Sequence, residues 1–161
     1  MKYFNNVATL EELKKEYHRL AMKFHPDREG GDLEEMKLIN IEYDKMFEVV
    51  KGFHRNKQNK IYSKYTGETN SEFKDIIDEL IKFGNIRVEI IGSFIWVSGE
   101  TKPIKDTLKK LGFRWHSKKM NWYKAPKGYR KTSKKQFAME ELRQMFITEE
   151  IKTNETRLAI Q

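Results

Sequence analysis

Residues 17–28 of this chain read YHRLAMKFHPDR, and this stretch decides the fold of the N-terminal part. It ends in a His-Pro-Asp tripeptide, and Pro26 disfavours helical geometry at the residue before it, so a helix must stop there. Upstream, Thr9 and Glu12 have the spacing of a capping box, which predicts that the helix begins at this point. Apolar residues recur along it at three- and four-residue steps and form one stripe: Leu10, Leu13, Tyr17, Leu20, Ala21 and Phe24.

A second helix is predicted beyond a short loop. Gly30 and Gly31 supply a flexible turn, and Asp32 with Glu35 repeats the capping-box signal. The apolar residues of this second helix make a matching stripe: Met36, Ile39, Tyr43, Met46, Phe47 and Val50. Two helices joined by a short loop bury such stripes against each other, which predicts an antiparallel hairpin.

A hairpin with a basic first helix and His-Pro-Asp in its loop resembles a J-domain, the module with which DnaJ-type co-chaperones activate DnaK-type ATPases. The resemblance covers residues 1–55 and is most specific at residues 17–28 and at the run INIEY of residues 39–43. The short loop of residues 28–32 is similar to that of compact J-domains of the phage or mobile-element type. The chain departs from the family in leaving only residues 1–8 for a first helix. It also has no glycine/phenylalanine-rich linker and no cysteine for zinc-binding repeats.

The resemblance implies two sets of residues that bind the ATPase. The cations that would steer the helix onto an acidic face of the partner are Lys14, Lys15, Arg19 and Lys23. The loop residues that would dock against the partner's inter-lobe linker, and so favour ATP hydrolysis, are His25, Pro26 and Asp27. The alternative interpretation is an ordinary solvated helix face followed by an ordinary turn, since proline and aspartate favour turns.

The net charge of +8 is concentrated in one segment. Residues 100–135 contain thirteen Lys and Arg residues against only Glu100 and Asp106, a local net charge of +11. The three tryptophans of the chain lie inside or beside this segment: Trp96, Trp115 and Trp122. So much charge of one sign repels itself, which indicates an anionic partner.

The rest of the chain predicts a small α+β domain after the all-α J-domain hairpin. Helix signals lie at residues 71–84 and 101–112, and strand signals at residues 86–91, 94–98, 113–116 and 121–124. A trailing helix is expected at residues 133–147. The predicted domains are a J-domain (1–55), a linker (56–70), a basic αββαββ domain (71–132), and a C-terminal helix with a polar tail (133–161). The polar connector of residues 51–70 could include a helical extension.

The basic domain carries a second resemblance. Residues 94–130, with LGFRWH at 111–116 and KMNWY at 119–123, are similar to small Gly-aromatic-Trp modules of primase-like and anti-restriction proteins. Lysines that neutralise phosphates beside aromatic rings that stack on bases suit single-stranded nucleic acid. The residues predicted to make these contacts are Lys109, Lys110, Arg114, Trp115, Lys118, Lys119, Trp122, Tyr123, Lys124 and Arg130.

Two alternatives stay open for this domain. A domain this small has few other residues from which to build a core, so its tryptophans could be buried instead of stacking on bases. The acidic target could also be a protein or an anionic membrane instead of a nucleic acid.

Other function classes leave little trace in the sequence. No apolar run approaches transmembrane length, so we expect a cytoplasmic protein without a membrane partner. No phosphate loop, nucleophile motif or metal-ligand spacing is present, so we expect no enzyme activity, no metal and no cofactor.

The sequence therefore predicts a co-chaperone whose basic module directs a DnaK-type ATPase toward nucleic acid or a nucleoprotein complex. The alternative is a nucleic-acid-binding regulator of a phage or mobile element that uses the hairpin only as a protein-docking surface.

Overall fold

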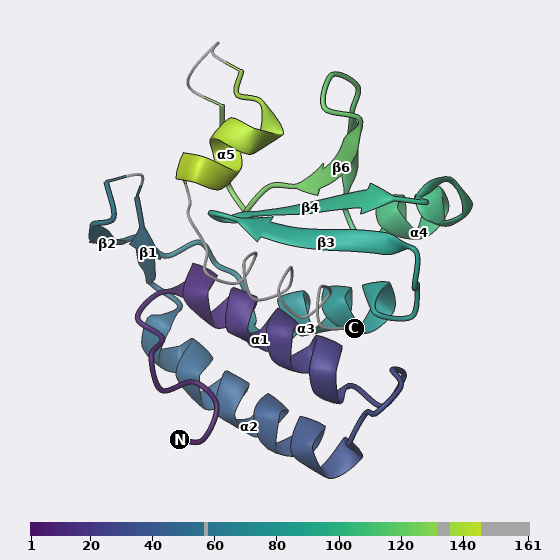
Figure 1. The fold of residues 1–161 in the computed structure, drawn as a ribbon. Coiled ribbons are helices and arrows are strands. Elements are labelled where there is room, and N and C mark those ends of the chain that lie inside the picture. Colours follow the sequence, from purple (N-terminus) through teal and green to yellow (C-terminus); the bar gives the residue numbers. More distant parts are fainter. Residues whose placement is uncertain (57, 132–135, 146–161) are drawn as a thin grey trace.

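A computed structural model describes residues 1–56, 58–131 and 136–145. The fold is α+β, as predicted: a helical hairpin is followed by two antiparallel sheets and a trailing helix (Figure 1).

The hairpin consists of α1 (Leu10–Phe24) and α2 (Leu33–Val50). The Thr9 hydroxyl accepts a hydrogen bond from the Glu12 N–H at 3.3 Å, so α1 begins at the predicted cap. The Asp32 carboxylate likewise accepts hydrogen bonds from Glu34 N–H and Glu35 N–H at the start of α2. The predicted stripes of both helices are largely buried, and the two helices pack against each other.

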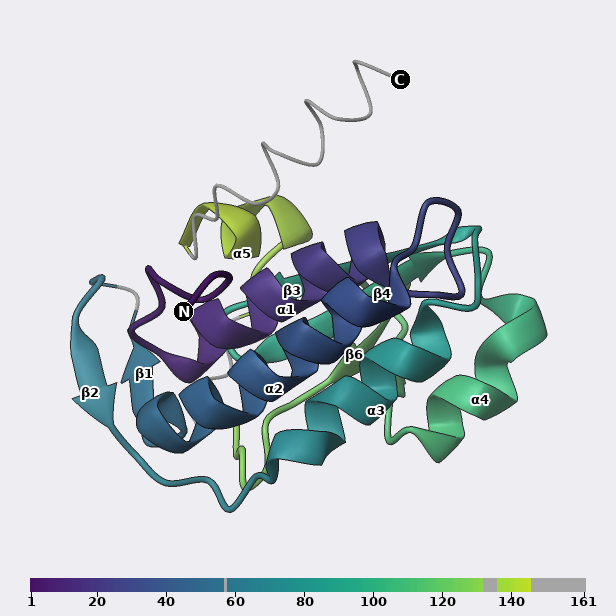
Figure 2. The ribbon, with the colours of Figure 1, turned by 90° about the horizontal axis from the view of Figure 1, so that it is seen from below.

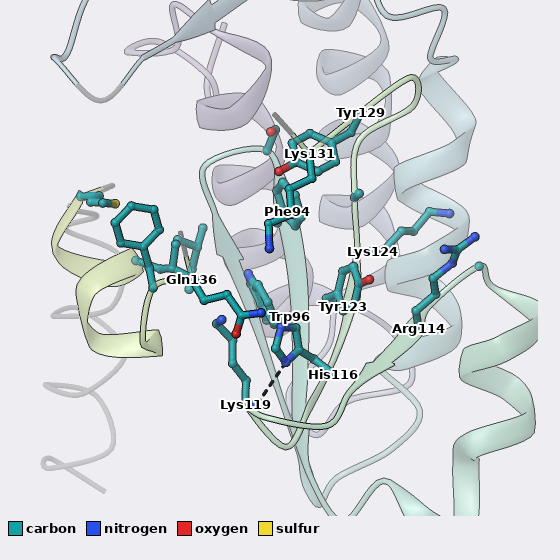
Figure 3. A pocket seen from close by; sticks show the side chains of 17 residues that line it. Phe94, Trp96, Arg114, His116, Lys119, Tyr123, Lys124, Tyr129, Lys131 and Gln136 are labelled. Atoms are coloured by element: carbon teal, nitrogen blue, oxygen red, sulfur yellow. Dashed lines mark hydrogen bonds between the residues drawn. The ribbon is translucent and has the colours of Figure 1, made fainter. Parts of the chain in front are cut away.

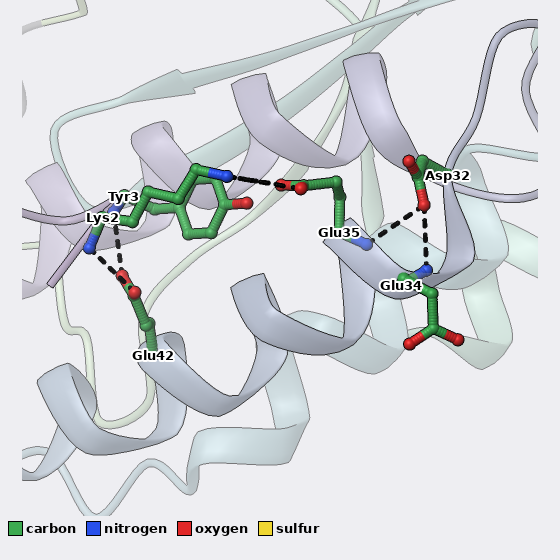
Figure 4. A network of polar contacts seen from close by, with 6 residues as sticks. All are labelled: Lys2, Tyr3, Asp32, Glu34, Glu35 and Glu42. Atoms are coloured by element: carbon green, nitrogen blue, oxygen red, sulfur yellow. Dashed lines mark hydrogen bonds and ion pairs between the residues drawn. The ribbon is translucent and has the colours of Figure 1, made fainter.

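The first nine residues form no helix and are tied to the hairpin by other contacts. Phe4 is buried in the core. The backbone N–H groups of Lys2 and Tyr3 each donate to the Glu42 carboxylate at 2.8 Å, and the Lys2 ammonium reaches Glu35 at 3.2 Å (Figure 4). This irregular segment is therefore held against α2 without forming a helix, and the resemblance had left only residues 1–8 for one.

A short hairpin follows α2, formed by β1 (Phe53–Arg55) and β2 (Ile61–Ser63). The connector therefore forms strands where the sequence also allowed a helical extension. The hairpin is fixed by a tertiary contact, because His54 Nδ1 lies 2.6 Å from Glu11 Oε1 of α1 and His54 Nε2 donates to the Lys64 carbonyl at 2.7 Å.

The C-terminal part follows the predicted order of elements. It contains α3 (Asn70–Leu80), β3 (Ile86–Ile91), β4 (Phe94–Gly99), the 3-10 turn η1 (Lys102–Ile104), α4 (Lys105–Lys110), β5 (Arg114–His116) and β6 (Asn121–Lys124). The four strands form one antiparallel sheet in the order β3-β4-β6-β5. The trailing helix α5 spans Met139–Met145. The predicted helix 133–147 is wrong at residues 136–138, which are not helical, and its residues 133–135 and 146–147 lie outside the described residues.

The helices α1, α2, α3 and α4 lie on one side of the sheet, and α5 lies on the other side (Figures 1 and 2). Because side chains alternate along a strand, Ile95 and Val97 of β4 point into the helical layer, where both are buried. The buried side chains of the hairpin and of the sheet form one continuous hydrophobic cluster that extends from Phe4 to Trp122. Among the described residues, no helix is long and apolar enough to span a membrane.

Candidate functional site

The His-Pro-Asp loop sits at the C-terminal end of α1 and is held by its own backbone. His25 has extended geometry (φ −62°, ψ 135°), as expected before a proline, and its N–H still closes the last turn of the helix on the Ala21 carbonyl. The Asp27 N–H donates to His25 Nδ1 at 3.2 Å. Pro26 and Asp27 are exposed. The loop therefore presents a rigid ring and a carboxylate to solvent.

The backbone of Gly31 packs closely against the backbone carbonyl group of His25. A Cβ atom added to Gly31 would lie 2.1 Å from the His25 carbonyl oxygen. Only a residue without a side chain fits there without moving the backbone, which gives a physical reason for a glycine at this position.

The imidazole of His25 is tied to α3. His25 Nε2 lies 3.0 Å from Asp78 Oδ1, and only 9% of the residue is exposed. Because Nδ1 accepts the Asp27 N–H, the ring proton of a neutral His25 belongs on Nε2, where it donates to Asp78. The histidine of the predicted partner-binding loop thus makes an internal contact.

The four predicted cations of α1 have different surroundings. Lys14 is buried, with its ammonium 2.6 Å from Glu68 Oε1 and 5.5 Å from the centre of the Phe73 ring. Arg19 pairs with Glu16 one turn earlier, Lys15 is half-buried, and Lys23 is exposed beside Phe24. The basic side of α1 that was predicted to face the ATPase is therefore only partly accessible, because α3 and β3 pack against this helix.

His18 shows the same burial on α1. Burial, with a smaller contribution from the positive charge of Arg28, lowers the pKa of His18 to about 4. His18 is therefore neutral in the folded protein at neutral pH.

The second candidate site is an aromatic groove on the sheet face that looks away from α1–α4. Phe94 and Trp96 of β4, His116 of β5 and Tyr123 of β6 supply its rings (Figure 3). The Trp96 ring centre lies 5.5 Å from that of Tyr123 and 6.2 Å from those of Phe94 and His116. Tyr129 packs edge-on against Phe94 at 4.8 Å. We call this site the aromatic groove; its volume is about 740 Å³.

Helix α5 forms one wall of the aromatic groove. Phe137, Leu142 and Met145 line it from this side. The Arg143 guanidinium makes a two-pronged contact with the Glu89 carboxylate of β3, with both N–O distances 2.8 Å. Glu89 is buried, so this paired arrangement anchors α5 to the sheet.

Four cations line the groove: Arg114, Lys119, Lys124 and Lys131. Burial and the positive charges of Lys119 and Lys131 lower the pKa of His116. Burial and the charges of Lys131 and Lys118 lower the pKa of Lys119. These shifts indicate a locally positive environment.

The structure brings together some of the predicted nucleic-acid residues and separates others. Arg114, Lys119, Tyr123 and Lys124 line the groove. Trp122 faces the helical layer and is 7% exposed, so it belongs to the core. Its cross-strand neighbour Trp115 shares that face and is 44% exposed. The remaining predicted cations are exposed and do not line the groove: Lys109, Lys110, Lys118 and Arg130.

Sequence reasoning did not select Phe94, Trp96, His116 or Tyr129 as contact residues. The signal that could have found the first two is the alternation in β4, where Ile95 and Val97 belong to the core and their neighbours must point the other way. Within the described residues, no group of three or more side chains is arranged to hold a metal ion.

Comparisons with known proteins agree with the geometry of the hairpin. The N-terminal part of the chain is similar to "Chaperone protein DnaJ" of Helicobacter pylori, with 36% identity over 76 residues, which cover 45% of this chain and 21% of the relative. The protein of the same name from Syntrophobacter fumaroxidans is 31% identical over 100 residues, covering 59% of this chain and 25% of the relative. The one from Acetobacter pasteurianus is 51% identical over 43 residues, covering 25% of this chain and 11% of the relative.

The hairpin with its His-Pro-Asp loop is thus a J-domain segment. The chain spans only about a fifth to a quarter of the length of the first two relatives. No family model and no solved structure matches the chain. None of the relatives bears on a phage or mobile-element origin, which stays a prediction.

Proposed function

We propose that this chain is a co-chaperone that binds a DnaK-type ATPase through its His-Pro-Asp loop and stimulates ATP hydrolysis, while its basic module binds nucleic acid or a nucleoprotein complex. The observation that carries the first half is the His-Pro-Asp loop at the tip of a J-domain hairpin whose sequence is similar to DnaJ chaperones.

The exposed groups near the tip suit an acidic partner. Lys23 is exposed, and Lys15 and Arg19 remain partly accessible on the same helix. Such cations raise the rate of encounter with an acidic surface and orient the complex. Pro26 and Asp27 stand exposed at the end of this helix. In this proposal the chain makes and breaks no bond itself; it stabilises the conformation of the ATPase that hydrolyses ATP.

Single-turnover ATP hydrolysis by a purified bacterial DnaK tests the first half. The intact protein should accelerate hydrolysis, and His25→Gln should abolish the acceleration. His116→Gln is the matched control, since it makes the same change on the sheet and should stimulate like the parent protein. Circular dichroism and the unfolding midpoint would verify that both variants fold. Stimulation that survives in His25→Gln would refute the proposal that the His-Pro-Asp loop activates the ATPase.

The second half rests on charge and aromatic side chains. The segment 100–135 has a net charge of +11, and cations from it line the groove beside the aromatic rings. Cations release counterions from a phosphate backbone, and aromatic rings stack on bases. The two halves would work together, with the J-domain recruiting the ATPase and the basic module selecting its site of action.

Binding of labelled oligonucleotides at low and at high salt tests the second half. Affinity that falls steeply with salt supports phosphate contacts. Absence of binding to DNA and to RNA at low salt would refute this half and leave the J-domain half intact.

A further inference from the structure

Among the residues that the structure describes, the cations of the aromatic groove have few carboxylates near them; Glu141 acts on Lys119 only at a distance. Within the described part of the chain, Arg114, Lys119 and Lys131 make no ion pair with a carboxylate, and no Asp or Glu lines the groove. The exposed cations elsewhere often have partners, as Lys127 has in Glu72 and Lys82 in Glu79. Cations that line one groove without carboxylate partners repel each other. An anionic ligand would relieve this repulsion.

The rings beside these cations form one aromatic cluster that is partly exposed to solvent. Phe94 and Tyr123 lie nearly parallel, with their centres 6.4 Å apart and an interplanar angle of 26°. Both are half-buried, and Tyr129 at the mouth of the groove is 49% exposed. Trp96 is only 6% exposed and forms the floor between them. Flat rings that keep one open face can each take a stacked planar group.

His116 adds a directional donor to this face. Its Nδ1 accepts the Lys119 N–H at 3.1 Å, so a neutral ring carries its proton on Nε2 (Figure 3). This leaves Nε2–H available to donate to an acceptor such as a phosphate oxygen or a base edge.

We propose that the aromatic groove binds a short single-stranded segment of nucleic acid, with bases against Phe94, Tyr123 and Tyr129 and phosphates against Arg114, Lys119 and Lys131. This inference rests on the second half of the proposed function and assigns its strandedness and its residues. A duplex keeps its base faces stacked inside and offers the rings nothing to stack on. Helix α5 also lines one side of the groove and so leaves less room for a wide double helix.

An acidic polypeptide is the competing ligand for the same cations. It would satisfy Arg114, Lys119 and Lys131, but few of its side chains are flat enough to use three adjacent ring faces. Bases supply such a face at every nucleotide, so the combination of rings and cations favours nucleic acid.

Fluorescence anisotropy with the full chain tests the inference. The probes are labelled oligothymidylate and oligouridylate of about 12 nucleotides and a duplex of the same length. Both single strands should bind more tightly than the duplex. Tyr129→Ala should weaken single-strand binding by roughly fivefold to a hundredfold, the range for one lost stack. Arg114→Gln should reduce the slope of log K against log salt by about 0.7.

Two matched controls lie on the same module but outside the groove. Trp115→Ala removes an exposed ring from the other face, and Lys109→Gln removes an exposed charge from α4. Both should bind like the parent protein. If Tyr129→Ala lowers the unfolding midpoint, Tyr123→Leu serves as the second ring variant.

Each other outcome overturns the inference in a recognisable way. Equal losses in the groove variants and the controls would mean that the module binds nucleic acid through its general charge. Tighter binding of the duplex would refute the single-strand assignment. Displacement of the oligonucleotide by polyglutamate at equal charge concentration, with Tyr129→Ala unchanged, would identify an acidic protein site. No binding of any oligonucleotide would refute the nucleic-acid half of the proposed function itself.

Discussion

The Nε2 atom of His25 lies 3.0 Å from Oδ1 of Asp78, although the two residues are 53 positions apart in the chain. The contact joins the tip of the J-domain hairpin to α3, the first helix of the C-terminal part. Under the proposed function, the ATPase must replace the Asp78 carboxylate before it reaches the His25 Nε2–H. The Asp78 side chain is 49% exposed, so it can rotate away while α3 stays in place.

We expect Asp78→Ala to make the protein a stronger stimulator. A partner that must first break an internal hydrogen bond can bind only the molecules in which that bond is open. Its apparent affinity is therefore the intrinsic affinity multiplied by the fraction of such molecules. Removing the bond should lower the concentration for half-maximal DnaK stimulation by about three- to tenfold. Glu79→Ala, an exposed neighbour paired with Lys82, is the control and should leave the curve in place. A higher half-maximal concentration for Asp78→Ala would mean that Asp78 orients the imidazole for the partner.

Gly31→Ala should damage the loop that carries His25. The new Cβ would meet the His25 carbonyl oxygen at 2.1 Å and the Arg28 carbonyl oxygen at 3.0 Å, and both are backbone atoms that cannot move alone. We expect a loss of about 1–3 kcal/mol in the free energy of unfolding, measured with urea, together with weaker stimulation of DnaK. Gly52→Ala, where a Cβ meets nothing within 4 Å, should lose far less. Equal stability of the two variants would contradict the close approach.

His54 should make the protein less stable toward alkaline pH. Its hydrogen bond to Glu11 raises its pKa above 6.5, so the folded state holds the proton more tightly than the unfolded chain does. This contribution is fully present below pH 6.5 and is lost as the pH rises through the raised pKa. His54→Gln should therefore flatten the alkaline side of a plot of unfolding free energy against pH. An unchanged alkaline slope would show that the pair does not titrate as described.

His18 should have the opposite effect on the acid side. Its pKa falls from 6.5 to about 4 on folding, chiefly by burial, so the unfolded chain takes up the proton first. The stabilisation is complete above pH 6.5 and is lost as the pH falls toward 4, by about 3 kcal/mol in order of magnitude. Urea unfolding between pH 7 and pH 4 should show this loss in the parent protein. His18→Leu puts a side chain that cannot take up a proton in the same place, so its unfolding free energy should fall less between pH 7 and pH 4. An identical fall would contradict the assignment of this loss to His18.

The helical hairpin could be predicted because its signals are local. Thr9 and Asp32 cap the helices that follow them, and the apolar stripes repeat with the period of a helix. The four strands of the main sheet were also predicted close to their bounds, since glycine turns and aromatic residues mark them. These features depend on residues a few positions apart.

The contacts of α3 could not be predicted in this way. Lys14 is buried because it contacts Glu68 and, on α3, Phe73, which lie far along the chain, and both α3 and β3 pack against α1. The β1–β2 hairpin was missed for a similar reason, because its strands are short and partly exposed and are fixed by the contact between His54 and Glu11. Contacts between residues far apart in the chain produce no repeating pattern in the sequence from which they could be predicted.

The composition of the groove could be predicted only in part. The excess of cations in residues 100–135 pointed to the part of the chain that contributes the cations of the groove. Which tryptophan enters the core depends on which sheet face the helices cover, and that is decided by the packing of α1 and α3. Trp122, which was predicted to contact nucleic acid, therefore lies in the core, whereas Trp96, which was not selected, lines the groove.

The continuous cluster from Phe4 to Trp122 has a mechanical consequence. Since one core supports both the loop at the end of α1 and the open face of the sheet, neither can swing independently of the other. A nucleic-acid strand bound to the sheet and an ATPase bound to the loop would therefore be held at a fixed distance and a fixed angle from each other. Lengthening the connection at residues 64–69 would not loosen that geometry, whereas cutting away either half would strip the other of its apolar cover.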